Sequence, residues 1–236
     1  AALRSARAQG LTLPVIWNSS GYEKADTLRM LEGLVDIFMP DFKTMSPELG
    51  MRYMKAPDYP ERAREALQCM AEMAGPAVFG ELAEAETARQ SVILQMDEAA
   101  AEMPVCEALP EWYPGEGVLM KKGLVVRHLV IPGQTEDSRA VLRYLYATYG
   151  DRIWISLMSQ YTPVGIFAEN RVLIDGTSSA PHLRGKYLEL CRKLSAQEYD
   201  EVVDYAISLG IENCMVQEED VASESFIPDF DGSGIL

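Results

Sequence analysis

The chain has 236 residues, of which 48% are hydrophobic and 24% are charged, and this composition fits a globular protein with a sizeable core. Its 36 acidic residues outnumber the 21 basic ones, and the net charge of -15 disfavours binding to nucleic acid or to an anionic membrane. No apolar run reaches the roughly 20 residues of a membrane span, and no basic segment followed by an apolar region opens the chain. We therefore expect a cytoplasmic protein with a single domain over residues 1–236.

The first segments alternate between strand and helix patterns. A helix is expected to end at Gly10, a strand is predicted over 13–17, and a helix is predicted over 23–33. Ser20 and Glu23 have the spacing of a capping box, which favours a helix start directly after the strand.

The same cycle then repeats. The continuous apolar run over 35–39 predicts a strand and is typical of a parallel sheet covered on both faces. A short helix should open at Ser46, and a longer one over 58–74 has its apolar residues on one face and ends at Gly75.

An Ala-, Glu- and Pro-rich excursion of about 80–120 follows, with a helix predicted near 84–103. After it, residues 123–133 contain a third strong strand, and 136–148 have the periodicity of a helix that Gly150 ends.

Residues 153–161 predict a fourth strand, followed by an irregular stretch with a possible hairpin at 171–176. Ser195 and Glu198 form a second capping box, opening a helix that ends before a fifth strand at 211–217. The alternation predicts an α/β fold with a parallel sheet, either a partial barrel or an open sheet. In both, the chemistry is expected at the carboxyl ends of the strands.

Polar side chains follow three of the predicted strands at these ends. Asn18 and Ser19 follow the first, Asp41 and Lys43 the second, and residues 159–162 the fourth. A carboxylate can accept hydrogen bonds from ribose hydroxyls, but Asp41 and Lys43 are equally consistent with an ordinary surface ion pair.

Arg127 and His128 are neighbours within a strand, so their side chains should point to opposite faces of the sheet. We expect His128 to be a hydrogen-bonded core histidine. The four cysteines, at 69, 106, 191 and 214, lie 37, 85 and 23 positions apart, without the close spacings of a zinc or iron-sulfur site. They are therefore predicted to be isolated reduced thiols.

Seven segments, taken in order, resemble radical S-adenosylmethionine (SAM) proteins related to pyruvate formate-lyase activating enzyme. They are NSSGYE, VDIFMPDFK, APDYPE, GLVVRHLVIPG, ISLMSQYTP, LSAQEYDEVVDYAISLGIENCMVQE and ASESFIPDFDG. The resemblance leaves about 80–120 and 167–187 as insertions.

This resemblance implies an incomplete parallel (β/α) barrel. In the family, a CxxxCxxC loop holds a [4Fe-4S] cluster whose fourth iron is chelated by SAM. No such motif occurs in this chain, and the resemblance places the loop and the first strands upstream of Ala1, so the chain is expected to be the C-terminal part of the barrel and inactive alone.

The resemblance also implies which residues contact the cofactor. Asn18 and Ser19 match polar strand-end residues near it, Asp41 and Lys43 match a D-x-K pair near the ribose and the carboxylate, and Arg127 matches an arginine on the cofactor side. Where activating enzymes have a histidine near the adenosine, this chain has Gln160 and Tyr161.

The implied activity is reductive cleavage of SAM to a 5'-deoxyadenosyl radical, with a glycine of a partner glycyl-radical enzyme as the target and a flavodoxin- or ferredoxin-type electron donor. Two alternatives stay open: a non-catalytic α/β binding or scaffold protein derived from this fold, and another barrel enzyme that uses Asp41 and Lys43 as an acid-base pair.

Overall fold

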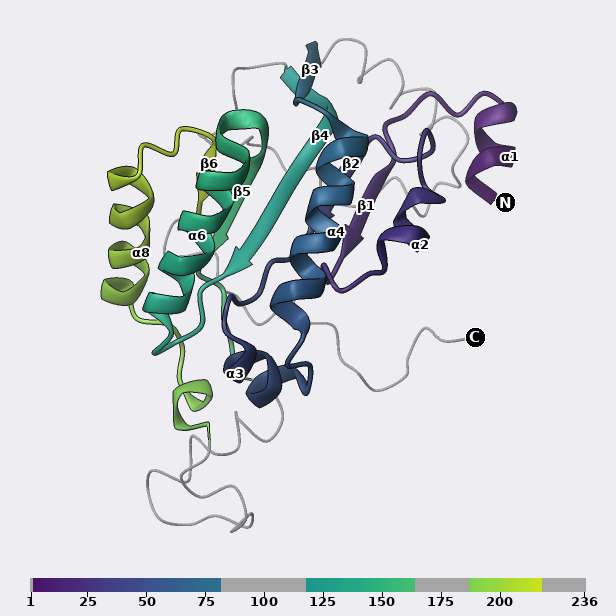
Figure 1. Cartoon of the computed structure of the whole chain (residues 1–236). Coiled ribbons are helices and arrows are strands. Elements are labelled where there is room, and N and C mark those ends of the chain that lie inside the picture. Colours follow the sequence, from purple (N-terminus) through teal and green to yellow (C-terminus); the bar gives the residue numbers. More distant parts are fainter. Residues whose placement is uncertain (1, 82–117, 164–186, 218–236) are drawn as a thin grey trace, which may run out of the picture.

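The computed structural model describes residues 2–81, 118–163 and 187–217, and at its centre lies a mostly parallel β-sheet packed against helices (Figure 1). The strands are β1 (Ile16–Ser19), β2 (Ile37–Pro40), β3 (Val78–Glu81), β4 (Val118–Leu129), β5 (Trp154–Met158) and β6 (Cys214–Val216). The α-helices are α1 (Ala2–Ala8), α2 (Ala25–Arg29), α3 (Pro47–Leu49), α4 (Tyr59–Ala74), α6 (Thr135–Tyr149) and α8 (Ala196–Ser208). Single turns of other helix types are η1 (Gly50–Met54), η3 (Gly150–Arg152) and η6 (Leu188–Cys191).

The parallel strands lie side by side in the order in which they occur along the chain, β1-β2-β4-β5-β6. Among the strands that the structure describes, β3 alone runs antiparallel, and it pairs with the first part of β4. Because each parallel strand joins the same edge and crossover connections are right-handed, the connecting helices collect on one face. Figure 1 shows α4 and α6 in front of the sheet, with α8 beside α6 at the edge where β6 lies. We call the opposite face the open face.

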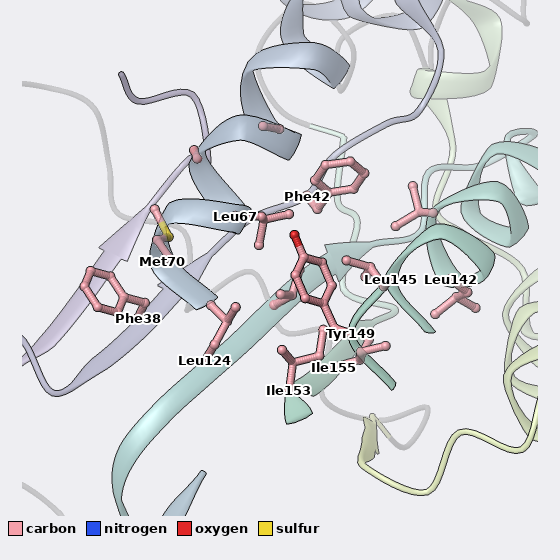
Figure 2. Packing of buried hydrophobic residues seen from close by; sticks show 14 of the residues in the cluster. Phe38, Phe42, Leu67, Met70, Leu124, Leu142, Leu145, Tyr149, Ile153 and Ile155 are labelled. Atoms are coloured by element: carbon pink, nitrogen blue, oxygen red, sulfur yellow. The ribbon is translucent and has the colours of Figure 1, made fainter. Parts of the chain in front are cut away.

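The core lies between the sheet and these helices, because alternate strand residues point toward them. Phe38 of β2, Leu124 of β4 and Ile155 of β5 are almost fully buried there. Figure 2 shows how Leu67 and Met70 of α4 pack near Phe38 and Leu124. Burying each such side chain contributes on the order of 1.5–3 kcal/mol.

Several predicted elements are confirmed with their end signals. The side chain of Ser46 caps α3 by accepting a hydrogen bond from the Leu49 N–H, and Ser195 and Glu198 form the predicted capping box of α8. Gly75 follows α4 in a positive-φ conformation, at +66°, which glycine adopts without strain.

The capping box at Ser20 and Glu23 is not formed, and this prediction was wrong. The helix begins later, at Ala25, after Lys24. The reason is tertiary: Gly21 has φ +75°, and the ring of Tyr22 stacks on Tyr59 with centroids 5.8 Å apart. These contacts hold the backbone away from helical geometry.

The sequence also placed the early strands about two residues too early and did not predict β3. The expectation of a sheet covered on both faces is corrected as well, since in the described residues the helices pack on one face. The apolar run at 35–39 nevertheless has a reason, because Ile37 and Met39 line a cavity on the open face.

Some predictions lie outside the described residues: the helix near 84–103, the hairpin at 171–176, and Cys106. The two ends of the predicted excursion of about 80–120 belong to β3 and β4, which pair through residues such as Gly80 and Leu119. Of the helices that the structure describes, none has the length and apolar character needed to cross a membrane.

Candidate functional site

The site is centred on Asp41, the first residue after β2. Its backbone N–H donates to the Ser19 carbonyl of β1 at 2.9 Å, and the next N–H, of Phe42, donates to the Arg127 carbonyl of β4 at 2.8 Å. Asp41 and Arg127 thus form a parallel bridge beyond the end of β2. The backbone therefore fixes Asp41 between two strands, at the carboxyl edge of the sheet where ligands of parallel sheets bind.

Two cations share the Asp41 carboxylate. Lys43 Nζ donates to Oδ2 at 2.7 Å, and Arg127 Nη2 lies 2.6 Å from Oδ1. The latter contact is an ion pair without hydrogen-bond alignment, and the buried Arg127 Nε has no hydrogen-bond partner among the described residues. The three groups together carry one net positive charge, and the guanidinium retains donors for a further acceptor.

Tyr59, at the start of α4, connects the backbone segments that follow β1 and β2. Its hydroxyl accepts from the Lys43 N–H at 3.0 Å and lies 3.0 Å from the Ser20 carbonyl and 3.1 Å from the Asp41 carbonyl. Burial raises the pKa of Tyr59 well above its ordinary value, so the hydroxyl keeps its proton and can donate. Sequence reasoning missed this positioning residue, although it lies within the segment APDYPE.

Gly21 allows the exit of β1 to come close to Asp41. A Cβ atom at Gly21 would lie 2.1 Å from the Asp41 carbonyl oxygen, which no side chain could accommodate. The glycine is thus required both for its positive φ and for this close approach.

A cavity of about 290 Å³, here called the rim cavity, opens beyond the ends of β2, β4 and β5. Its lining is mostly apolar and includes Lys43, Leu49, Met54, Leu129, Ile131, Tyr161 and Leu190. The Tyr161 hydroxyl donates to the Leu190 carbonyl at 2.8 Å, and burial raises the pKa of Tyr161 to about 12, so this tyrosine stays neutral.

One wall of the rim cavity is held by a contact between η1 and η6. Glu189 Oε1 accepts hydrogen bonds from the Tyr53 hydroxyl at 2.6 Å and from Arg52 Nη2 at 2.7 Å. The Arg52 guanidinium also lies over the rings of Tyr53 and Tyr187. These contacts fix Leu190 against the cavity; no sequence pattern indicated them, because they join residues more than 130 positions apart.

His128 confirms the sequence prediction of a buried, hydrogen-bonded histidine. Its Nδ1 lies 2.7 Å from the Phe42 carbonyl, and its Nε2 lies 2.9 Å from Ser138 Oγ. A carbonyl only accepts, so Nδ1 carries the proton and Nε2 accepts from the Ser138 hydroxyl. Burial lowers the pKa of His128, which keeps the ring neutral. As predicted, it points away from the face on which Arg127 lies.

A second cavity of about 400 Å³, the open-face cavity, lies on the other side of the sheet. Arg127 and Ser156 line it, and its remaining walls are largely apolar, with Ile16, Ile37, Met39, Phe79, Leu119, Met120, Val125, Trp154, Met215, Val216 and Gln217. Arg127 therefore joins the Asp41 cluster to the open-face cavity, while Lys43 joins it to the rim cavity.

The remaining predicted residues are less closely gathered. Asn18 shares the face of Ile16 and is exposed, whereas Ser19 points to the other face and its Oγ accepts from the Gly21 N–H at 3.3 Å. Gln160 lies near the rim, where its Nε2 contacts Met158 Sδ at 3.7 Å, but it lines neither cavity. Of the seven predicted residues, the structure brings Asp41, Lys43 and Arg127 into direct contact, and places Tyr161 in the cavity that Lys43 lines.

The described cysteines lie apart, as expected. Cys69 and Cys191 are buried free thiols, and Cys214 is a partly buried free thiol in β6. Within 2–81, 118–163 and 187–217, no three histidine, cysteine, aspartate or glutamate side chains are arranged to hold a metal ion.

Comparison with known proteins adds little to this geometry. No family model matches the chain. A segment of 47 residues is 38% identical to the uncharacterized protein MJ0674 of Methanocaldococcus jannaschii. The match covers 20% of this chain and 14% of the relative, so the chain spans only a small part of that protein.

Proposed function

We propose that the Asp41 cluster binds S-adenosylmethionine and that the chain is part of a radical SAM protein of the glycyl-radical-enzyme activating type. The observation that carries the proposal is the contact of Asp41 with Lys43 and Arg127 at the carboxyl edge of the sheet, beside the rim cavity. The sequence resemblance named these three residues from two separate segments of the chain.

The strand order supports the proposal. Parallel strands that add in sequence to one edge, with their helices on the outer face, have the connectivity of a (β/α) barrel. We propose that the sheet is the C-terminal part of such a barrel and that the open face lines its interior.

The residues present fit the organic part of SAM. A carboxylate can accept hydrogen bonds from both ribose hydroxyls, which suits Asp41, and an ammonium can pair with the methionine carboxylate, which suits Lys43. The apolar wall of the rim cavity, with Leu129 and Tyr161, suits an adenine ring. Arg127 would orient the Asp41 carboxylate through their ion pair.

The described residues do not fit the iron-sulfur cluster, since their cysteines lie far apart and the sequence has no CxxxCxxC motif. In the proposal the cluster ligands come from residues outside these 236. Bound beside a reduced cluster, SAM would supply radical chemistry, and Asp41, Lys43 and Arg127 would hold and orient its organic part. A glycine of a partner enzyme as its target, and a flavodoxin- or ferredoxin-type donor, remain part of the proposal through the resemblance alone.

Equilibrium binding of radiolabelled SAM to the chain tests the proposal without the cluster. We expect saturable binding that adenosine displaces, and a loss of about tenfold or more in Asp41→Asn, because hydrogen bonds to a charged group contribute roughly 1.5–3 kcal/mol. Asp151→Asn, at an exposed position distant from the site, is the control and should bind as the wild type does. Absence of saturable binding, or equal binding by the two variants, would contradict the proposal.

The alternative of a non-catalytic binding protein is favoured by one observation, the lack of clustered cysteines. It predicts the same SAM binding but no chemistry. A protein extended by the preceding coding sequence, reconstituted with iron and sulfide under anaerobic reduction, separates the two. Release of 5'-deoxyadenosine supports the enzyme, and intact SAM supports the binding protein.

A further inference from the structure

The open-face cavity has a polar end and an apolar end. Arg127 and Ser156 lie in register on neighbouring strands, toward the carboxyl end of the sheet. Trp154, one pleat away on the same face of β5, and Phe79 and Leu119 from the β3–β4 pair lie toward the amino end. The cavity therefore changes from apolar to polar along the strand direction.

The β3–β4 pair closes the apolar end. Figure 1 shows β3 at the end of the sheet opposite α3. The ring of Phe79 meets Trp154 edge-on, with centroids 5.6 Å apart, and so joins β3 to the open face of β5. Among the described residues, Phe79 and Trp154 thus form the apolar end of the cavity, and the apolar part of a ligand is expected to lie against them.

The charge at the polar end favours an anion. Arg127 and Lys43 together exceed the single charge of Asp41, so one positive charge remains uncompensated within the cluster. The Arg127 side chain is only 26% exposed, which limits screening by water. Because the Nε atom has no partner among the described residues, the guanidinium still has hydrogen bonds to donate.

We propose that the open-face cavity is a second ligand site, distinct from the rim cavity, and that it takes a small carboxylate with an aromatic or branched aliphatic body. The carboxylate pairs with Arg127, and the body packs among Met39, Trp154 and Met215. The volume of about 400 Å³ is within the usual range of roughly 300–1,000 Å³ for small-molecule pockets. The proposed function also uses Arg127, to orient Asp41, but the test of this second site uses neither SAM nor a cluster, so the failure of one proposal is distinguishable from the failure of the other.

Titration with 4-phenylbutyrate, and with 4-phenylbutanamide as the uncharged analogue of the same shape, tests this site in the absence of SAM. With methyl-labelled methionine, NMR signals of Met39 and Met215 report on the open-face cavity, and that of Met54 reports on the rim cavity. We expect phenylbutyrate to shift the first two signals and not the third, and to bind at least tenfold more tightly than the amide.

Two variants sharpen the result. Arg127→Met should abolish the preference for the carboxylate, whereas Arg143→Met, the same change on the exposed surface of α6, should preserve it. If Arg127→Met does not fold, Ser156→Phe is a second test of the same site. The phenylalanine side chain should fill the open-face cavity and block the binding of both phenylbutyrate and phenylbutanamide. Shifts confined to Met54, equal binding of the two probes, or no saturation with either would overturn the proposal.

Discussion

The carboxylate of Glu198 links three segments of the chain, which makes it a sensitive position for a stability measurement. Arg192 holds it through two parallel hydrogen bonds of 2.6 and 2.7 Å, and the backbone N–H of Gly133 donates to Oε1 at 2.7 Å. Ser195 adds its own N–H at 3.1 Å and its hydroxyl at 2.8 Å. The Glu198 side chain thus caps α8 and also connects the start of α8 to the turn that precedes α6.

Replacing this carboxylate by an amide, Glu198→Gln, removes the charge and turns one acceptor into a donor. In either orientation the new NH2 group faces the Arg192 guanidinium, together with the N–H of Gly133 in one orientation and that of Ser195 in the other, and all of these groups are donors. A hydrogen bond to a charged group contributes about 1.5–3 kcal/mol, and an N-terminal cap about 1 kcal/mol. Since Arg192 is 45% exposed, solvent screening reduces the first figure, and we expect a total loss of about 2–3 kcal/mol.

The loss of stability in Glu198→Gln should become smaller as the pH falls. The Arg192 guanidinium and the N–H donors hold the pKa of Glu198 far below its ordinary value of 4.5 in the folded chain. On acidification the unfolded chain therefore binds the proton first, so the stabilisation is present above about pH 4.5 and declines as the pH falls. The glutamine variant does not titrate, and the difference between it and the wild type should shrink from pH 7 to pH 3.5.

Urea unfolding followed by far-UV circular dichroism at pH 7, 5 and 3.5 measures this difference. The control is Glu136→Gln, whose carboxylate is 81% exposed and pairs only with Arg139 on the same helix, so its effect should be at most about 0.5 kcal/mol. A Glu198→Gln effect as small as the control, or one that stays constant over this pH range, would refute the reasoning.

Two further changes test the geometry around the site, again by urea unfolding at pH 7. Gly21→Ala should cost several kcal/mol because its Cβ would overlap the Asp41 carbonyl, while Gly33→Ala, also at positive φ but with no atom within 4 Å, should cost only about 1 kcal/mol; similar costs would contradict the close approach. His128→Leu should cost about 2–4 kcal/mol by leaving buried polar groups without partners, and adding Ser138→Ala should recover part of this loss. No recovery in the double variant would argue against the assigned hydrogen bond.

The long helices and the parallel strands were predictable because their determinants are local. In α8 the apolar face, the capping box and the glycine that follows the helix all lie within one segment, and in α4 the apolar face, the proline of the first turn and Gly75 do the same. The face assignment of Arg127 and His128 required only the two-residue period of a strand. Local sequence patterns of this kind were therefore sufficient to predict most of the α/β fold.

Other features depend on contacts between distant segments, and the sequence could not indicate them. β3 is a short strand whose pairing partner lies about 40 residues further along the chain, so its pattern alone did not distinguish it from a loop. The failed capping box at Ser20 shows the reverse case, because stacking of Tyr22 on Tyr59 overrides a favourable local signal. The contact of Glu189 with Arg52 likewise exists only once η1 and η6 are brought together.

The position of Asp41 follows from the register of three strands. Its N–H pairs with β1 and the following N–H pairs with β4, so neither neighbour can slip without moving the carboxylate. The chain leaves β2 at this point, so the next two side chains point in different directions. Phe42 enters the core and Lys43 reaches the rim cavity. Arg127, on β4, lies on the open face. One carboxylate therefore contacts cations that belong to two cavities on opposite sides of the sheet edge. A ligand that draws Lys43 or Arg127 away from Asp41 changes the charge presented to the other cavity, and binding at the two cavities should consequently be coupled.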